Sequence, residues 1–390
     1  MKFDYLIIGA GFSGLVFAER MANVLGRSCL VVEKRPHIGG NSYDEYDAAG
    51  ILIHKYGPHY FRTNSDRVRE YLTRFTDWLP VQYKVLSWTD GQYWSFPVNL
   101  KTFEQLQGRV CTEEEFVKYL AEKRVPIDNP NNSEEAVVAK VGWEIYEKFF
   151  KNYTQKQWGR PPCDLDASVC GRIPIRTNRD DRYLRENFQA LPKAGYARMF
   201  EKMITCNSKI HVLLNADYRD IRNYVQYNKI VCTGPIDEYF DYRLGHLPYR
   251  SLRFERTTYS AAELEQRFFV SGQRGFWQPS LQVNYPNDFG YTRTVEMKHA
   301  TQQQSEVSTV VREYPLEYSS GQEPYYPIPN ATTDRLLADY CKYAEKNGNG
   351  TLFLGRLAEY KYYNMDQVVE NALRAADAEI ERCKAGSTRY

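Results

Sequence analysis

The sequence predicts an α/β protein in which a discontinuous Rossmann-like domain is interrupted by a helical domain and an antiparallel β-sheet domain. An apolar run at residues 4–8 leads into a glycine-rich turn and a helical apolar pattern. Residues 102–122 and 133–157 have helical periodicity and many Glu and Lys residues. Apolar and polar residues alternate from about residue 228 to 330, and strand and helix patterns return after residue 351.

The glycine-rich turn has the spacing of a dinucleotide-binding motif. Gly9, Gly11 and Gly14 follow the first predicted strand, and a second predicted strand at residues 29–32 ends at Glu33. The first glycine permits a tight turn, the second lets the backbone approach a pyrophosphate, and the third lets the helix pack close to the strand. The helix N-terminus offers free N–H groups to phosphates, and Glu33 is placed to bind a ribose hydroxyl. We therefore predict a dinucleotide site at this turn.

The residues that follow Glu33 indicate which dinucleotide binds, because the glycine motif alone does not distinguish NAD from FAD. A further glycine pair, Gly39 and Gly40, gives a second place where the backbone can approach the ligand, which favours FAD. The residues of this region that we expect to hold FAD are Gly9, Gly11, Phe12, Ser13, Gly14, Glu33, Lys34, Gly40 and Asn41.

The same patterns predict where the three domains begin and end. The predicted ranges are 1–80, 190–235 and 335–390 for the FAD-binding domain, 100–188 for the helical domain, and 81–99 and 236–334 for the sheet domain. Within the helical domain, residues 161–182 combine prolines with basic residues, as expected of a mobile loop over a binding site.

Charge and cysteine content exclude several classes of protein. The 390 residues include 51 Lys and Arg against 49 Asp and Glu, a formal net charge of +2, which argues against a generally basic nucleic-acid binder. Eight scattered cysteines without a Cys-x-x-Cys pair are typical of reduced thiols, and the histidines lack metal-ligand spacing. No apolar run reaches the roughly 18 residues of a membrane-spanning helix. We expect a cytoplasmic protein with no metal, no nucleic-acid partner and no membrane insertion.

Tyrosine is abundant, at 32 residues. Its flat apolar ring and polar tip suit a pocket that holds rings and oxygen-rich groups. The excess is equally compatible with a tyrosine-rich surface and core, so composition leaves both interpretations open.

Motifs along almost the whole chain resemble those of the UDP-galactopyranose mutase family, whose members are bacterial flavoenzymes. The matching positions are 9–14, 33, 39–41, 56–59, 149–159, 249–254, 283–286, 291–293, 324–327, 355–356 and 362–366. The resemblance implies an isomerase that uses FAD without net redox chemistry. In this family, N5 of the reduced flavin attacks the sugar and displaces UDP to form a flavin–sugar adduct, and the ring opens and recloses before UDP returns. It also implies an external reductant such as NAD(P)H, and a homodimer.

The resemblance also implies roles for individual residues. Arg172 and Arg293 are expected to clamp the diphosphate during catalysis, since arginine forks onto phosphate oxygens. His59 is the third expected catalytic residue and lies beside the flavin, as do Arg356 and Met365. The further expected substrate contacts are Arg62, Phe149, Tyr153 (stacked on uracil), Thr154, Trp158, Tyr183, Arg250, Asn284, Tyr326, Tyr362 and Asn364. The alternatives are a core position for Phe149, a solvated strand face for Arg250 and a purely structural, capped histidine for His59.

Three features depart from the usual family pattern. Many relatives have Asp where this chain has Asn364, which puts a charge-based role there in doubt. Relatives that act on plain UDP-galactose usually have His at the position of Arg62, whereas an N-acetylated branch resembles this chain in having Arg. We hypothesise that Arg62 reaches an acyl oxygen, so that UDP-N-acetylgalactosamine is accepted along with UDP-galactose; a local salt bridge is the alternative. The stretch 263–282 is longer than usual, and the sequence gives it no role.

Two other functions are compatible with the N-terminal motif. A flavin-dependent oxidase of an amine or sugar has this fold but needs no arginine clamp for a diphosphate. A flavoprotein that binds a UDP-sugar without catalysis would keep every binding residue, so the sequence does not separate it from an enzyme.

Overall fold

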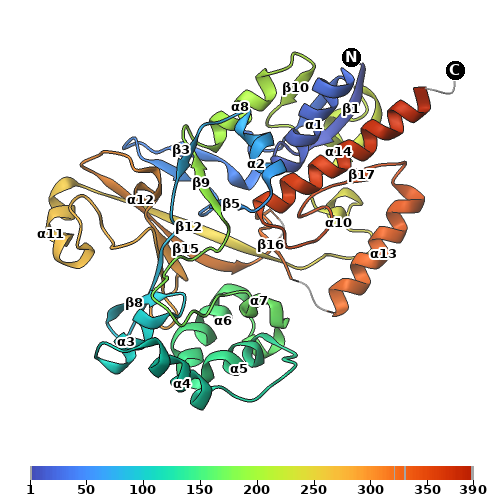
Figure 1. Ribbon diagram of the computed structural model, residues 1–390. Coiled ribbons are helices and arrows are strands. Elements are labelled where there is room, and N and C mark those ends of the chain that lie inside the picture. The colour runs from blue at the N-terminus through green and yellow to red at the C-terminus, as the bar shows by residue number, and fades with distance from the viewer. Residues whose placement is uncertain (1, 320, 329–330, 388–390) are drawn as a thin grey trace.

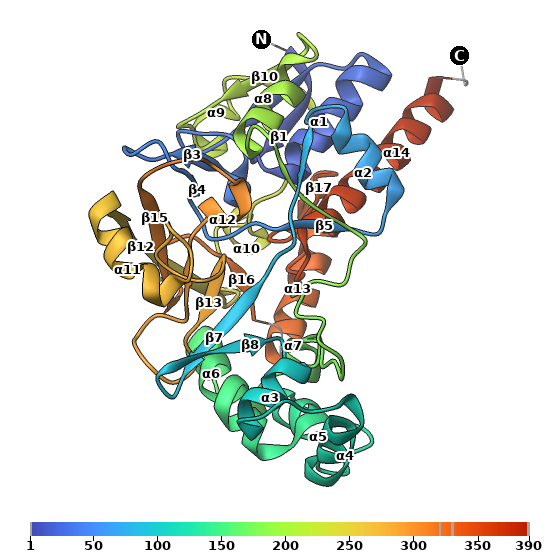
Figure 2. The same ribbon diagram turned by 60° about the vertical axis from the view of Figure 1, so that its left-hand side comes forward.

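The computed structural model describes residues 2–319, 321–328 and 331–387. A parallel sheet lies at the end of the molecule that holds β1 and the C-terminal helix α14 (Figure 1). A helical lobe lies at the opposite end, and the strands of a second sheet run between them (Figures 1 and 2).

The parallel sheet has the strand order of a dinucleotide-binding fold. Its neighbouring strands are, in order, β10 (Ile210–Leu213), β2 (Cys29–Val32), β1 (Lys2–Ile8), β11 (Gln226–Cys232) and β17 (Leu352–Phe353). α1 (Phe12–Leu25) packs against both α14 (Met365–Ser387) and α8 (Tyr196–Thr205). The Rossmann-like fold is confirmed, and its strands come from distant parts of the chain, as predicted.

Smaller elements complete this region. They are η1 (Gly40–Ser42), β3 (Asp44–Tyr46) paired with β4 (Leu52–His54), the sheet of β5 (Phe61–Thr63), β9 (Phe188–Pro192) and β6 (Trp78–Pro80), and the helices α2 (Asp66–Thr73), α9 (Tyr218–Ile221), α10 (Ile236–Tyr239) and α13 (Ala331–Asn347).

The second sheet has seven strands and is almost entirely antiparallel. Its order is β16 (Tyr326–Pro327), β12 (Tyr249–Tyr259), β15 (Ser308–Glu317), β14 (Arg293–Val295), β13 (Gln282–Asn284), β7 (Val85–Thr89) and β8 (Gln92–Phe96). The exception to the predicted antiparallel arrangement is the parallel pair β13–β7. The helical domain separates these two strands in the chain, so no hairpin fixes their relative direction.

The strand pattern predicted for residues 228–330 is interrupted by three helices, α10, α11 (Ala261–Ser271) and α12 (Lys298–Thr301). α11 begins with a capping box between Ser260 and Glu263 and ends at Gly272 in the left-handed region. Leu264 packs on the sheet, and Trp277 stacks on Tyr259 with ring centroids 3.5 Å apart. The stretch 263–282 therefore covers part of the second sheet.

The helical lobe contains more breaks than the periodicity indicated. Its elements are α3 (Leu100–Gln107), α4 (Glu113–Lys123), α5 (Ser133–Tyr146), a π-helical turn (Glu147–Lys151), α6 (Asn152–Trp158), η3 (Pro162–Asp164) and α7 (Ala167–Gly171). Residues 102–122, which have helical periodicity, form two helices, because Gly108 ends α3 and Thr112 caps α4. Within residues 133–157, Gly142 interrupts the helical conformation of α5; a Cβ there would lie 2.4 Å from the carbonyl oxygen of Lys123.

Candidate functional site

A pocket opens at the carboxyl ends of β1, β2 and β11, where this class of sheet binds its ligands. It encloses about 1280 Å³ of empty space, including its open mouth. Among its lining residues are Gly9, Gly11, Phe12, Ser13, Glu33, Lys34, Gly40, Asn41, His59, Arg356 and Met365. The structure thus brings together all of the residues expected around the cofactor except Gly14.

Because the glycines lack a Cβ, two backbone segments, or a backbone segment and a ligand, can approach each other closely at this turn. Gly9 has φ of +102°, and a Cβ on Gly14 would lie 2.1 Å from the carbonyl oxygen of Gly9. A Cβ on Gly40 would lie 3.1 Å from the Cα of Gly11, so the two glycine turns face each other across the pocket wall. This bare backbone at the start of α1 fits a pyrophosphate.

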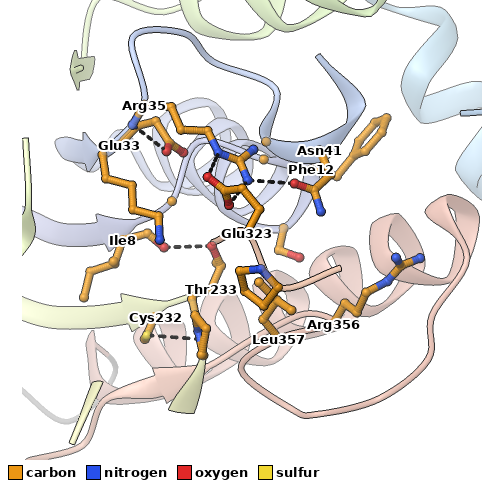
Figure 3. Close-up of a pocket in the computed structure, with 18 of the residues that line it drawn as sticks. Ile8, Phe12, Glu33, Arg35, Asn41, Cys232, Thr233, Glu323, Arg356 and Leu357 are labelled. Atoms are coloured by element: carbon orange, nitrogen blue, oxygen red, sulfur yellow. Dashed lines mark hydrogen bonds and ion pairs between the residues drawn. The ribbon is translucent and has the colours of Figure 1, made fainter. Parts of the chain in front are cut away.

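Glu33 is held by backbone amides and keeps spare acceptor capacity. One of its carboxylate oxygens accepts from Ala10 N at 2.9 Å, and the other accepts from Arg35 N at 3.0 Å. The Arg35 side chain lies between Glu323 and Asn41 and bonds to both (Figure 3). The sequence patterns do not indicate Arg35 and Glu323 as site residues, since nothing local links two residues that lie 288 positions apart.

His59 lines the same pocket as a neutral imidazole. Its Nδ1 lies 2.8 Å from the carbonyl oxygen of Gly57, which can only accept, so Nδ1 carries the proton. Burial lowers the pKa of His59 to about 4, and the charges of Arg356 and Arg293 act in the same direction.

Next to this pocket lies a cluster of aromatic rings and arginines. The rings of Tyr326 and Tyr362 stack with centroids 5.7 Å apart, and Trp158 lies 6.3 Å from each. The guanidinium of Arg172 lies 4.8 Å from the Tyr362 ring centroid and donates to its hydroxyl at 3.4 Å. Arg356 lies 5.4 Å from the same ring, so it belongs to both the pocket and the cluster.

The cluster holds positive charge that carboxylates do not neutralise. Burial would raise the pKa of Tyr362, but Arg172, Arg356 and Arg293 outweigh burial and lower that pKa below its usual value. Within the described residues, neither Arg172 nor Arg356 forms an ion pair with a carboxylate. Such a site suits an anion with several oxygens, such as a diphosphate.

Arg293 is the arginine of the cluster that does have an acidic partner. It faces Glu313 across the β14–β15 pair, with Nη2 2.8 Å from Oε1, and the Glu313 side chain is 1% exposed. The Nε of Arg293 is buried without a hydrogen-bond partner among the described residues. Burial raises the pKa of Tyr153, and the groups that act on Tyr153 electrostatically include Arg293 and Glu313, so Tyr153 belongs to the same neighbourhood.

Three residues that the sequence predicts as substrate contacts are in contact with other side chains of the protein. Phe149 is 3% exposed and packs against Trp94 in the helical core, which agrees with the core alternative. Thr154 contacts Cys170 of α7, with Oγ1 and Sγ 3.2 Å apart. Arg62 donates through Nε to Glu186 at 3.0 Å, which is the local salt bridge considered as the alternative.

Arg250 is buried, so the solvated strand face is wrong. Its Nε donates to the carbonyl oxygen of Gln157 at 3.1 Å, and Nη2 donates to that of Lys156 at 3.4 Å. A cation at these carbonyls stabilises the C-terminal end of α6. Because α6 carries Tyr153 and Trp158, Arg250 contributes to their placement.

The remaining expected residues flank the cluster. Asn284 pairs with Arg293 across β13–β14 and accepts from Gln282 at 2.8 Å. Asn364 directly precedes α14, and its backbone N–H donates to Gln367 at 2.9 Å. Tyr183 adds to the electrostatic environment of both Arg172 and Tyr153.

No helix in the described ranges is long and apolar enough to cross a membrane. Within the same residues, no three His, Cys, Asp or Glu side chains gather as a metal site would require.

Comparison with known proteins identifies the family. Residues 148–362 match the UDP-galactopyranose mutase family, and residues 7–75 match the NAD(P)-binding Rossmann-like domain. The chain is 36% identical to a probable UDP-galactopyranose mutase of Klebsiella pneumoniae over 96% of this chain and 94% of that protein. It is 32% identical to a dTDP-fucopyranose mutase of Escherichia coli, over 97% of this chain and 99% of that one.

A solved structure agrees in fold. The crystal structure of a reduced UDP-galactopyranose mutase superposes with a TM-score of 0.69 at 17% identity, covering 98% of this chain and 94% of that chain. Together with the sequence relatives, these matches show that the chain belongs to the UDP-galactopyranose mutase family and is an isomerase that acts on the pyranose and furanose forms of a sugar.

Proposed function

We propose that the protein interconverts UDP-galactopyranose and UDP-galactofuranose with a reduced flavin and no net redox change, and that it also accepts the N-acetylated sugar. The observation that carries this proposal is the position of Arg356, which lines the dinucleotide pocket and also contacts the arginine–tyrosine cluster. A nucleotide sugar bound by the cluster would therefore have its diphosphate next to the cofactor.

FAD is the cofactor that we propose for the pocket. The facing glycines Gly11 and Gly40 and the spare acceptor capacity of Glu33 support the fit of a dinucleotide. When bound and reduced, the flavin would supply the nucleophilic N5 that displaces the nucleotide from the sugar. α14 begins at Met365, and its free N–H groups favour negative charge at this end of the pocket. We further propose an external reductant such as NAD(P)H, and a homodimer.

The chain's own residues would hold the leaving group in place. Arg172, Arg293 and Arg356 can neutralise the diphosphate, which keeps UDP close by for its return to the sugar. Tyr153 would stack on uracil. The rings of Trp158, Tyr326 and Tyr362 would exclude water from the reacting carbon.

Arg62 is the residue on which acceptance of the N-acetyl group depends. Its guanidinium bonds Glu186 through Nε. The Nη donors of an arginine are geometrically separate, so they can serve an acyl oxygen while Nε stays bonded. One relative, from E. coli, is named for dTDP-fucopyranose, so a dTDP-6-deoxy sugar is the alternative substrate to test.

The test supplies each candidate substrate to the photoreduced protein and separates pyranose from furanose by chromatography. We expect both UDP-sugars to be converted, and Arg62→His to lower the ratio of N-acetylated to plain product by roughly tenfold, the value of one hydrogen bond to a charged group. If Arg62→His leaves the ratio unchanged, or UDP-galactose alone reacts, the N-acetyl assignment is wrong. Conversion of dTDP-fucose alone, sugar oxidation, or binding without furanose formation would contradict the proposed reaction.

A further inference from the structure

The turn that carries His59 is held by two buried side chains, His54 and Tyr196. His54, at the end of β4, is 3% exposed, and Tyr196, at the start of α8, is fully buried. The backbone N–H of His59 donates to His54 Nδ1 at 2.9 Å. The Tyr196 hydroxyl donates to the carbonyl oxygen of His59 at 3.1 Å. Both backbone polar groups of His59 therefore bond to side chains.

These two side chains belong to one packed unit. The Asp44 carboxylate accepts from the backbone N–H groups of Tyr196 and Ala197, at 2.6 and 2.8 Å. Asp44 is also the cross-strand partner of His54 in the β3–β4 pair, and the His54 and Tyr196 rings meet edge to face at 5.6 Å. The position of the His59 backbone is thus fixed by packed elements on two sides.

The hydrogen bonds also determine the two imidazole tautomers. His54 Nδ1 accepts from a backbone N–H, so neutral His54 carries its proton on Nε2, and burial lowers the pKa of His54 to about 3. His59 carries its proton on Nδ1, which faces the carbonyl of Gly57. The remaining acceptor of the His59 ring is Nε2, on a residue that lines the dinucleotide pocket.

We propose that His54 and Tyr196 are positioning residues that keep His59 Nε2 available as an acceptor for an N–H group of the bound cofactor, and so favour the reduced flavin. This inference rests on the proposed use of a flavin. Reduction adds an N–H to the isoalloxazine ring, so an acceptor fixed in the pocket binds the reduced form more tightly than the oxidised form.

The experiment measures the midpoint potential of the bound flavin in equilibrium with a reference dye, together with the Tm. His54→Leu removes the acceptor, His54→Asn keeps one near the place of Nδ1, and Tyr196→Phe removes only the hydroxyl. Tyr340→Phe is the matched control, because Tyr340 is buried and donates to the carbonyl of Gly245, outside the pocket lining.

We expect His54→Leu and Tyr196→Phe each to lower the preference for the reduced flavin about tenfold, which is about 30 mV for a two-electron couple. kcat of the reduced enzyme should fall, while KM for the nucleotide sugar stays unchanged. His54→Asn and Tyr340→Phe should keep the wild-type potential.

The proposal is overturned if His54→Leu and Tyr196→Phe keep the wild-type potential while only Tm falls, if His54→Asn shifts the potential as far as His54→Leu, or if the protein binds no flavin. If the His54→Leu variant does not fold, the midpoint potential of Tyr196→Phe alone tests the proposal, since that substitution removes a single oxygen atom. The potential is measured without turnover, so a protein that binds flavin but forms no furanose would refute the proposed function and leave this test intact.

Discussion

The three arginines of the arginine–tyrosine cluster, Arg172, Arg293 and Arg356, are each held by a different kind of partner. Arg356 donates through Nε to the backbone carbonyl of Tyr363 at 3.1 Å, and Arg172 bonds the hydroxyl of Tyr362. Arg293 is paired with buried Glu313. Removal of a guanidinium that is held by a carbonyl or a phenol leaves no charge unpaired, whereas removal of Arg293 leaves the buried Glu313 carboxylate without its partner. The three residues should therefore respond differently to substitution.

Arg172→Ala and Arg293→Ala should separate binding from stability. Loss of either cation should lower kcat/KM about 10- to 100-fold, from one or two charge-assisted hydrogen bonds to the diphosphate. Arg293→Ala should in addition lower the free energy of unfolding by about 3 kcal/mol, because Glu313 is left buried without its partner. Arg172 is exposed, so its removal should leave stability nearly unchanged. Steady-state kinetics and urea unfolding measure the two effects.

The double variant Arg293→Ala/Glu313→Gln tests whether the stability loss of Arg293→Ala comes from the unpaired Glu313 carboxylate. Replacing the carboxylate removes the unpaired charge, so the double variant should recover much of the lost stability but none of the activity. Equal stability losses in Arg172→Ala and Arg293→Ala would show that the Arg293–Glu313 pair does not matter in this way.

The neutral state of His59 has a consequence for pH dependence. Burial lowers its pKa to about 4, below the ordinary value of 6.5, so the folded protein takes up this proton only near pH 4. The stability that this group contributes is present above pH 6.5 and is lost as pH falls from about 6.5 toward 4. Between pH 5.5 and 8, kcat/KM of the reduced enzyme should show no inflection from His59. An inflection near pH 6.5 that disappears in His59→Asn would contradict this assignment.

At the scale of elements, the α6–α7 unit sets the position of Arg172. α7 lies within residues 161–182, where the sequence analysis expected a mobile loop. Its Cys170 is buried and contacts Thr154 of α6, and Ser133 of α5 accepts from the Cys170 backbone N–H at 3.2 Å. The segment therefore has an anchor two residues before Arg172. Closure over a ligand remains a prediction, which would involve the exposed part of the segment after α7.

Limited trypsin digestion with and without UDP tests closure. Arg172, Arg176, Arg179 and Arg182 supply cleavage sites within the segment. UDP should slow cleavage there severalfold, because a segment held against the ligand opens to the protease less often. Cleavage at equal rates in the two conditions would count against a ligand-dependent lid.

Elements whose signals are local in the chain could be predicted, and contacts between distant elements could not. The β1–α1–β2 unit and the start of α14 at Met365 follow from glycine spacing, apolar periodicity and helix-start patterns. The capping box of α11 was also a readable signal, but the surrounding alternation hid it. The pairs Arg293–Glu313, Arg35–Glu323 and Tyr196–His59 depend on strand register and chain crossing, which no short-range pattern contains.

At the scale of the whole molecule, the family's fold does not determine which sugar is bound. Relatives of similar identity are named for UDP-galactopyranose and for dTDP-fucopyranose. What these names share is a nucleoside diphosphate sugar, and the diphosphate is the part that the arginine cluster suits best. Selectivity for the base and sugar must therefore come from other side chains, and we propose Tyr153 and Arg62 for this role.

The reaction that we propose is a flavin-dependent isomerisation without net redox change. The most direct measurement counts furanose molecules formed per electron pair supplied, with anaerobic photoreduced protein and UDP-galactose. We expect many furanose molecules per electron pair, a flavin that stays reduced throughout, and no product from the oxidised protein. One oxidised sugar per flavin, or equal furanose formation by oxidised and reduced protein, would contradict it.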